Sequence, residues 1–361
     1  MIGEMLGALF PSTSKPLGTL LARTLPCALA ASLALTLQAT ADPSPADFAA
    51  RFQTAERAGQ NVVQGSDGWL FLPAELRMLS FPRFWGADAP KTSRSPKPEW
   101  ADPLPAIVNF HTQLKARGIT LLLVPVPPKA SIYPEKLFGT GSTPSAPTTA
   151  PIANFLAALR EAGVETLDLA PLFTANRAGA HGPMFCATDT HWSGSACVLA
   201  AQEIAGSIRS KLPTPAPNTF QAEWKSVPIQ GDLLTLAGAA STTPSPEKID
   251  VRSISHSGSG APVDTDPSSP LLLLGDSHTL VFHDFLAERS GLADQLAHEL
   301  GFAPDVIGTR GSGATPVRLS LFRRSVKDPA YLTHKKVVVW CLSAREFTEA
   351  DSGWQLVPLT K

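Results

Sequence analysis

Two short stretches of the chain bring together the side-chain types that nucleophilic catalysis needs. The first, Gly275-Asp276-Ser277, follows directly on the apolar run Leu271–Leu274, and the second is Asp189-Thr190-His191-Trp192. A serine hydroxyl is a weak nucleophile and needs a neighbouring base. Residues two apart in an extended segment point to the same side, so Asp189 can hold one ring nitrogen of His191 while the other accepts the serine proton. The two stretches therefore supply a nucleophile, a base and an orienting acid.

Each stretch also has a purely structural interpretation. Ser277 is a suitable N-cap for the helix expected after it, although a serine at a helix start also presents its own N–H to developing negative charge. Asp189 would serve as the N-cap of the helix that starts near Ser193. Asp189 and His191 are alternatively half of a metal site, for which His181 is the nearest further ligand in the sequence.

The elements that must position these residues alternate between strands and helices. Continuous apolar runs predict strands, and apolar residues recurring at three and four predict helices. The expected strands are 119–127, 165–171, 270–275, 305–309 and 335–343, and the expected helices lie near 104–117, 152–162 and 315–325, with further ones beginning near 193 and 279. Strands that are apolar throughout indicate a parallel sheet covered on both faces, in one α/β domain. Sites in such sheets form beyond the carboxyl ends of the strands, and both stretches fall there.

Composition sets limits on the other function classes. The chain has 361 residues, 43% of them hydrophobic, and a formal net charge of −1. This is ample for a sizeable core, and no basic field indicates nucleic-acid binding. Proline is frequent at 34 residues, against an average of about 5%, and residues 212–231 and 241–269 are predicted to be Pro/Ser/Gly-rich loops.

The N-terminus has the pattern of a targeting segment. Lys15 and Arg23 precede a short apolar run that ends in the small-residue site Ala39-Thr40-Ala41. This pattern predicts a signal peptide over 1–41, or alternatively an uncleaved signal anchor, and either places the rest of the chain outside the cytoplasm. We expect a linker over 42–58, the folded domain over 59–350 and a tail over 351–361.

The cysteines allow two interpretations. A disulfide between Cys186 and Cys197 is plausible in an oxidising compartment. The alternative is that these two and Cys341 are buried thiols. No Cys-x-x-Cys pair occurs, so a metal site built on cysteine is not expected.

The chain resembles a known family through the order of its motifs. An apolar strand followed by Gly-Asp-Ser, with Asp-Thr-His-Trp elsewhere, is similar to the SGNH/GDSL hydrolases, but here Asp189 and His191 precede Ser277. That permuted order resembles the SGNH-like domain of the alginate O-acetyltransferase (AlgJ/AlgX) family. Three further stretches are similar to that family, namely Gly65–Leu72, Val124–Leu137 and Val337–Phe347. One departure is Cys341, which stands where the family usually has a glutamate.

The resemblance implies a fold and a reaction. The fold would be a three-layer α/β/α sandwich with a mainly parallel sheet and circularly permuted motifs, in a single-domain AlgJ-type chain. Ser277 would carry an acetyl group, with His191 as base and then acid and Asp189 as its orienter. The Ser277 N–H and a second donor, Gly311 or Gly313, would form the oxyanion hole.

The resemblance also implies substrates and partners. The acceptor would be an exopolysaccharide in the periplasm, and a membrane-bound O-acyltransferase would supply acetyl groups, within a polysaccharide secretion complex and with no cofactor. Candidate substrate contacts are Lys129, Tyr133, Trp192 and Arg345, although the first three also suit structural roles. Two other functions stay open: a glycan acetylesterase with the same triad, and a non-catalytic glycan-binding subunit, against which the intact triad counts.

Overall fold

The structure is a computed structural model that describes residues 42–139, 148–214, 219–238 and 246–360. The predicted signal segment, 1–41, lies outside the described residues. Among the helices that are described, none combines the length and the apolar character needed to cross a membrane.

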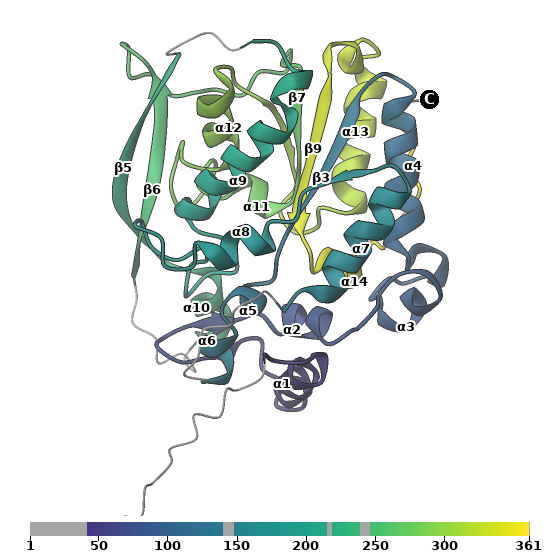
Figure 1. Cartoon of the computed structure of the whole chain (residues 1–361), viewed down its shortest axis with the longest axis vertical. Coiled ribbons are helices and arrows are strands. Elements are labelled where there is room, and N and C mark those ends of the chain that lie inside the picture. The colour runs from purple at the N-terminus through teal and green to yellow at the C-terminus, as the bar shows by residue number, and fades with distance from the viewer. Residues whose placement is uncertain (1–41, 140–147, 215–218, 239–245, 361) are drawn as a thin grey trace, which may run out of the picture. The chain divides into compact units, whose positions relative to one another are not determined.

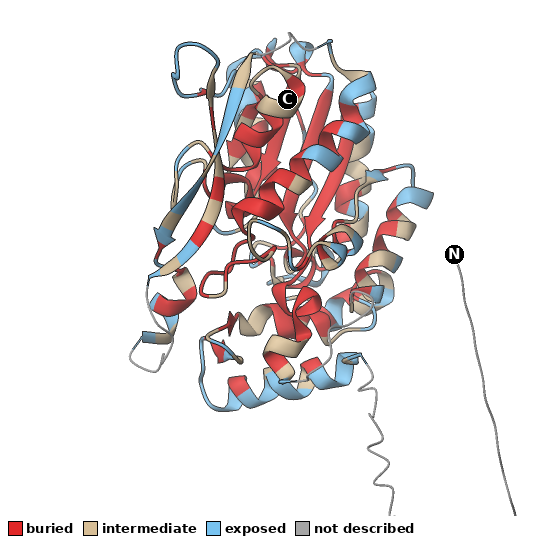
Figure 2. Cartoon of the chain, turned by 60° about the vertical axis from the view of Figure 1, so that its left-hand side comes forward, coloured by how far each residue is buried: buried red, intermediate tan, exposed pale blue. Residues whose placement is uncertain are grey.

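Five parallel strands form the central sheet. In spatial order they are β4 (Glu165–Thr166), β3 (Thr120–Val126), β9 (Val337–Ser343), β7 (Leu271–Gly275) and β8 (Asp305–Gly308). β3, β7 and β9 are buried along almost their whole length, and Figure 2 shows their ribbons buried while the flanking helices expose their outer sides. The predicted parallel α/β sheet is confirmed, although β4 is shorter than expected.

Helices cover both faces of this sheet (Figure 1). One face carries α4 and α13, and the other carries α9 and α12; their bounds are Pro103–Lys115, Thr315–Lys327, Gly194–Ile208 and Leu292–Leu300. Trp340 of β9 shows how the first face is packed. Its ring lies 5.2 Å from that of Phe110 in α4, and the guanidinium of Arg318 in α13 lies 5.4 Å from it. One aromatic side chain thus joins a central strand to two helices.

The stretches that we expected to be loops contain a long antiparallel ribbon instead. β5 (Phe220–Ile229) pairs with β6 (Glu247–His256), and β6 packs against α9 and α12 on their outer side (Figure 1). The loop prediction is wrong here because β5 is exposed along most of its length. Its polar side chains therefore show no apolar strand pattern.

The two ends of the described chain are also ordered parts of the fold. The expected linker, 42–58, holds the helix α1 (Pro45–Arg57), whose Phe48 is buried 5.4 Å from Phe138. In the expected tail, Trp354 is buried 5.8 Å from the Trp340 ring. Both segments contribute to the core, so the description of them as linker and tail is wrong.

Candidate active site

Ser277 lies at the carboxyl end of the central strand β7. Gly275 ends the strand, Asp276 caps the short helix α11 (Ser277–Leu280), and Ser277 is its first residue. A Cβ on Gly275 would lie 1.9 Å from the Cys341 carbonyl oxygen, so the turn needs glycine here. The N-cap is Asp276, whose carboxylate accepts from the His278 N–H at 2.9 Å, so the interpretation of Ser277 as the cap is wrong. The backbone N–H of Ser277 lies in the first turn of α11 and has no acceptor within the helix.

His191 and Asp189 meet Ser277 from an irregular segment that precedes α9. His191 Nε2 lies 2.8 Å from Ser277 Oγ, and His191 Nδ1 lies 2.6 Å from Asp189 Oδ1. Asp189 Oδ1 also accepts from the His191 backbone N–H at 2.9 Å. The interpretation of Asp189 as a helix cap is wrong, because Ser193 caps α9 with its own hydroxyl. The three side chains form one continuous line of hydrogen bonds from acid to hydroxyl.

The protonation state of this line follows from its surroundings. Burial alone would raise the pKa of Asp189, but the hydrogen bond and charge of His191 and two backbone N–H donors lower that pKa to about 2. An ionised carboxylate only accepts hydrogen bonds, so Nδ1 of His191 carries the proton. In the neutral form of the ring, Nε2 then has a lone pair that can accept from Ser277 Oγ–H.

The histidine segment is held by two carboxylates that sequence reasoning missed. Glu247 of β6 accepts from the backbone N–H groups of Ala187 and Thr188 at 2.8 and 2.9 Å. Asp232 accepts from the Thr190 backbone N–H at 2.8 Å and from its hydroxyl at 2.6 Å, and the Asp232 N–H donates to Asp189 Oδ2 at 2.8 Å. The only local signal was the Gly-Asp pair before an apolar run at 231–234, a pattern typical of a helix start.

A buried lysine completes this support. Lys129 is 1% exposed, and its Nζ donates to the carbonyl oxygens of Leu70 at 2.8 Å and Asp189 at 2.6 Å. Its predicted contact with substrate is therefore wrong. The Lys129 side chain instead stabilises the backbone of the catalytic segment through the Asp189 carbonyl oxygen.

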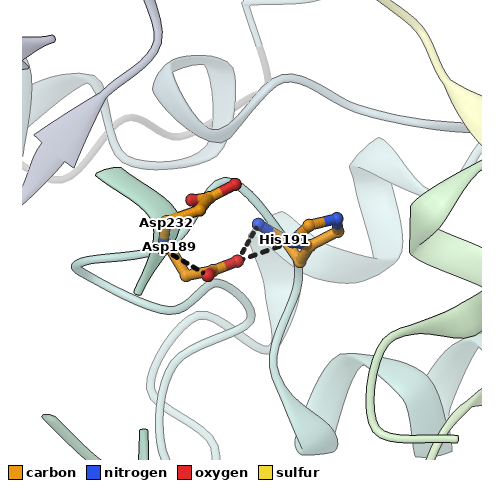
Figure 3. A group of neighbouring side chains, drawn as sticks. All are labelled: Asp189, His191 and Asp232. Carbon is orange, nitrogen blue, oxygen red and sulfur yellow. Dashed lines mark hydrogen bonds and ion pairs between the residues drawn. The ribbon is translucent and has the colours of Figure 1, made fainter. Parts of the chain in front are cut away.

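The side chains around His191 are also of the types that bind metal ions. Asp189, His191 and Asp232 each offer one ligand atom, all within 4.8 Å of one another (Figure 3). Two ligands of one tetrahedral zinc ion, each about 2.0–2.1 Å from it, would lie roughly 3.3 Å apart, whereas His191 Nδ1 and Asp189 Oδ1 are 2.6 Å apart. That separation is a hydrogen bond, and both Asp232 oxygens are occupied by Thr190. The group therefore fits a triad with its support better than a metal site.

Two more of the predicted substrate contacts lie in the core. The Tyr133 hydroxyl donates to the Arg177 carbonyl at 2.9 Å and accepts from the Met184 N–H at 2.8 Å, and Trp192 is fully buried. The predictions for Tyr133 and Trp192 are wrong, because neither side chain reaches solvent. Arg345 is half-buried, 3.6 Å from Glu75, and its role stays a prediction.

The two candidates for a second oxyanion donor differ in position. A Cβ on Gly313 would lie 3.0 Å from the Asp276 Cβ and 3.1 Å from the Asp276 nitrogen, so this glycine packs directly on the serine turn. Gly311 has a left-handed φ of 108° and open space on the corresponding side. The Trp340 indole donates to the Gly313 carbonyl at 2.9 Å. These contacts favour Gly313 over Gly311.

The three cysteines in the described part of the chain are free thiols. Cys186, Cys197 and Cys341 are all buried and unpaired, so the alternative of three thiols holds and the Cys186–Cys197 disulfide does not form. Cys186 Sγ contacts the Trp192 carbonyl at 3.6 Å. Burial raises the pKa of each thiol well above its usual value, which keeps all three unreactive.

Comparison with known proteins places this geometry in a family. The family model for the SGNH hydrolase-like domain of the acetyltransferase AlgX matches residues 62–343, a range that includes Ser277, His191 and Asp189. The chain is 30% identical over 234 residues to the probable alginate O-acetylase AlgJ of Pseudomonas aeruginosa, covering 60% of this chain and 55% of that protein. It is 28% identical over 302 residues to the corresponding protein of Pseudomonas putida, covering 80% and 71%.

The lengths and the solved structures add two facts. The chain spans about half the length of the AlgJ proteins of Pseudomonas aeruginosa and Pseudomonas syringae, 55% and 49%. The O-acetyltransferase domain of Pseudomonas putida AlgJ superposes with a TM-score of 0.60 at 24% identity, covering 80% of this chain and 92% of that one. Pseudomonas aeruginosa AlgX superposes with a TM-score of 0.57 at 18% identity, covering 79% and 62%. These two likenesses show a common fold.

Proposed function

The chain belongs to the family of AlgX-type SGNH hydrolase-like acetyltransferase domains, and from this premise we propose that it is an extracytoplasmic O-acetyltransferase. It would move an acetyl group through Ser277 onto hydroxyls of an exopolysaccharide, alginate or another glycan. The observation that carries the proposal is the line of hydrogen bonds from Asp189 through His191 to Ser277, 2.6 and 2.8 Å long. The names of the AlgJ relatives, probable alginate O-acetylases, support the choice of reaction.

In the first half-reaction, Ser277 Oγ attacks the carbonyl carbon of the acetyl donor while its proton passes to His191 Nε2. The negative charge that develops on the carbonyl oxygen meets the Ser277 N–H and a donor from the Gly313 loop. The tetrahedral intermediate collapses by breaking the bond to the leaving group, and His191 donates the proton it received from Ser277 to this leaving group. Asp189 stays ionised throughout and stabilises the imidazolium.

In the second half-reaction, a sugar hydroxyl gives its proton to His191 Nε2 and attacks the acetyl carbon. The bond to Ser277 Oγ breaks, and His191 returns the proton to that oxygen. The products are an acetyl ester on the glycan and the free serine. No electrons are exchanged, so the reaction needs no redox cofactor.

The setting follows from the same proposal. The predicted signal over 1–41 would deliver the domain to the periplasm, by a cleaved peptide or a retained anchor. A membrane-bound O-acyltransferase would supply the acetyl donor there, and a polysaccharide secretion complex would present the acceptor. These partners and this location are part of the proposal.

The test follows acetyl groups from a simple ester. The protein is incubated with p-nitrophenyl acetate, with and without polyuronate, and acetyl is measured on Ser277, on the glycan and as free acetate. We expect wild type to acetylate serine and glycan, and Ser277→Ala to lose nitrophenol release by roughly 10³-fold or more. Ser226→Ala, an exposed serine on β5, is the matched control and should behave as wild type.

Two results would redirect or end the proposal. Faster release of acetate from an acetylated glycan than transfer to a free one would identify an esterase. Equal, slow nitrophenol release by wild type and Ser277→Ala, with no acetyl on serine or sugar, would leave a non-catalytic subunit.

A further inference from the structure

One wall of the site is a segment with an unusual backbone. Between α11 and α12, the residues Phe282, Leu286 and Arg289 have left-handed φ values of 61°, 65° and 56°. Bulky side chains rarely adopt this conformation. Such strain persists only where the surrounding structure enforces it, and it concentrates at functional sites.

Specific contacts hold this segment in place. The Phe282 N–H donates to the Phe285 carbonyl at 2.8 Å, and the Ser290 N–H donates to the Phe282 carbonyl at 2.7 Å. Arg289 donates to the Val263 carbonyl at 2.8 Å. The backbone that carries Phe285 is therefore fixed from both sides.

The fixed aromatic ring joins the catalytic histidine to a surface cation. The centroid of the Phe285 ring lies 5.5 Å from that of His191, with the rings at 74°. The Arg310 guanidinium lies over the same ring, 4.6 Å from its centroid. These two contacts together put the guanidinium carbon within about 10 Å of the His191 ring. A glycan whose hydroxyl is at His191 Nε2 spans that distance with one or two sugar residues.

Arg310 differs from two other arginines of this part of the molecule in having no carboxylate as an ion-pair partner among the described residues. Arg252 pairs with Glu299 at 3.0 Å, and Arg289 pairs with Asp264 at 3.2 Å. Arg310 is exposed, and within the described ranges no carboxylate lies at ion-pair distance from it. A guanidinium that rests on an aromatic face keeps its planar fork of N–H donors free for a carboxylate.

We propose that Arg310, supported on Phe285, binds a carboxylate of the acceptor and so selects a uronate-bearing polysaccharide over a neutral one. This rests on the proposed function for the position of the acceptor, and it assigns the residue that recognises the charge of the acceptor. Arg310 is a specificity-determining residue, because it contacts the acceptor away from the reacting hydroxyl.

Binding tests the proposal without turnover. In the Ser277→Ala background, calorimetry compares oligogalacturonate with its methyl ester, which has the same backbone and no charge. We expect the acid to bind about fivefold more tightly, the upper range for one exposed ion pair, and added salt to reduce this ratio. Arg310→Gln should bring the ratio to one, and Arg310→Lys should keep part of it, since the charge stays and the fork is lost. Arg323→Gln, an exposed arginine of α13, should keep the full ratio.

Two outcomes overturn the subsite: acid and ester bind equally in the Ser277→Ala background, or Arg310→Gln keeps the ratio. The binding ratio and the Ser277-dependent acetyl chemistry are measured separately. A preserved ratio without acetyl transfer contradicts the proposed function alone, and transfer without a ratio contradicts the subsite alone.

Discussion

The serine side and the histidine side of the site are built by different means. The serine side is the turn Gly275–Ser277, which regular structure positions because it lies between β7 and α11. The histidine side is the irregular segment 187–192, which depends on Glu247, Asp232 and Lys129 from distant parts of the chain. A nucleophile placed by a strand end is set by local sequence, whereas its base is set by long-range polar contacts.

This difference has a consequence for mutation. On the histidine side, single side chains far in sequence from His191 should control activity. On the serine side, the residues that control activity should be Ser277, its immediate turn and the Gly313 loop that packs on this turn.

The largest effect is expected within the histidine side itself. Asp189→Asn replaces an acceptor by an amide, which removes the group that fixes the His191 tautomer. We expect acetyl transfer to fall on the order of 10³–10⁴-fold, and the free energy of unfolding to fall as well, because the charged acceptor of three N–H groups is lost. Steady-state transfer rates and thermal unfolding measure the two quantities, and a fall below tenfold would show that Asp189 does not orient His191.

A smaller effect should follow from loosening the support. Glu247→Ala leaves the Ala187 and Thr188 N–H groups without their acceptor, and a misplacement of about 1 Å can cost about 10²-fold in rate. We expect a loss of that order in kcat. Lys248→Ala, its exposed neighbour, is the control, and equal activity of the two variants would mean that the segment is positioned without Glu247.

The support that Lys129 gives to the histidine side should be visible in the stability of the protein. Lys129→Met leaves the buried carbonyl oxygens of Leu70 and Asp189 without their donor, which should cost about 4 kcal/mol in the free energy of unfolding, roughly 2 kcal/mol for each. Lys136→Met breaks a surface pair with Asp67 (2.6 Å) and should cost at most about 1 kcal/mol. Urea unfolding compares them, and similar costs would show that Lys129 is not structural.

The two sides should also respond differently to pH. Next to the serine side, burial is the main cause that raises the pKa of Glu346 to about 7, and the charge of Asp276 in the serine turn acts in the same direction. The Glu346 carboxylate accepts from the Ser312 hydroxyl. A carboxyl whose pKa is higher folded than unfolded binds protons more tightly in the folded state. Stability should therefore fall by up to about 3 kcal/mol as pH rises from 4.5 to 7. On the histidine side, the pKa of Asp189 is lowered from 3.8 to about 2. The folded state therefore loses the stability that this carboxylate contributes only in acid, as pH falls through that range.

Glu346→Gln isolates that contribution. The amide mimics the protonated acid, so the variant should show a flatter dependence of unfolding free energy on pH between 4.5 and 7. Glu223→Gln, at an exposed position of β5, should keep the wild-type slope. An unchanged slope in Glu346→Gln would show that Glu346 titrates at its ordinary pKa.

The same contrast explains what the sequence could predict. The strand at 270–275 and the glycine after it are local patterns, and the triad follows from residue types at short spacing, so the order of elements and the Asp189–His191–Ser277 line were within reach. The roles of Lys129 and Tyr133 were not, because their position in the sequence says nothing of the carbonyl oxygens they meet in the core. The strand β5 was missed because most of its side chains are exposed. In β6, the alternation of buried Ile249 and Val251 with polar neighbours is a strand signal that was within reach.

Whether the acetyl group passes through Ser277 is best decided from the mass of the peptide containing this serine, after a brief incubation with p-nitrophenyl acetate and rapid acid quenching. We expect one added acetyl group on Ser277, which disappears when polyuronate is added and reappears as an ester on the glycan. We expect no such adduct in His191→Ala, since the serine then has no base. An unmodified Ser277 peptide while acetyl still reaches the glycan would show that transfer does not pass through Ser277.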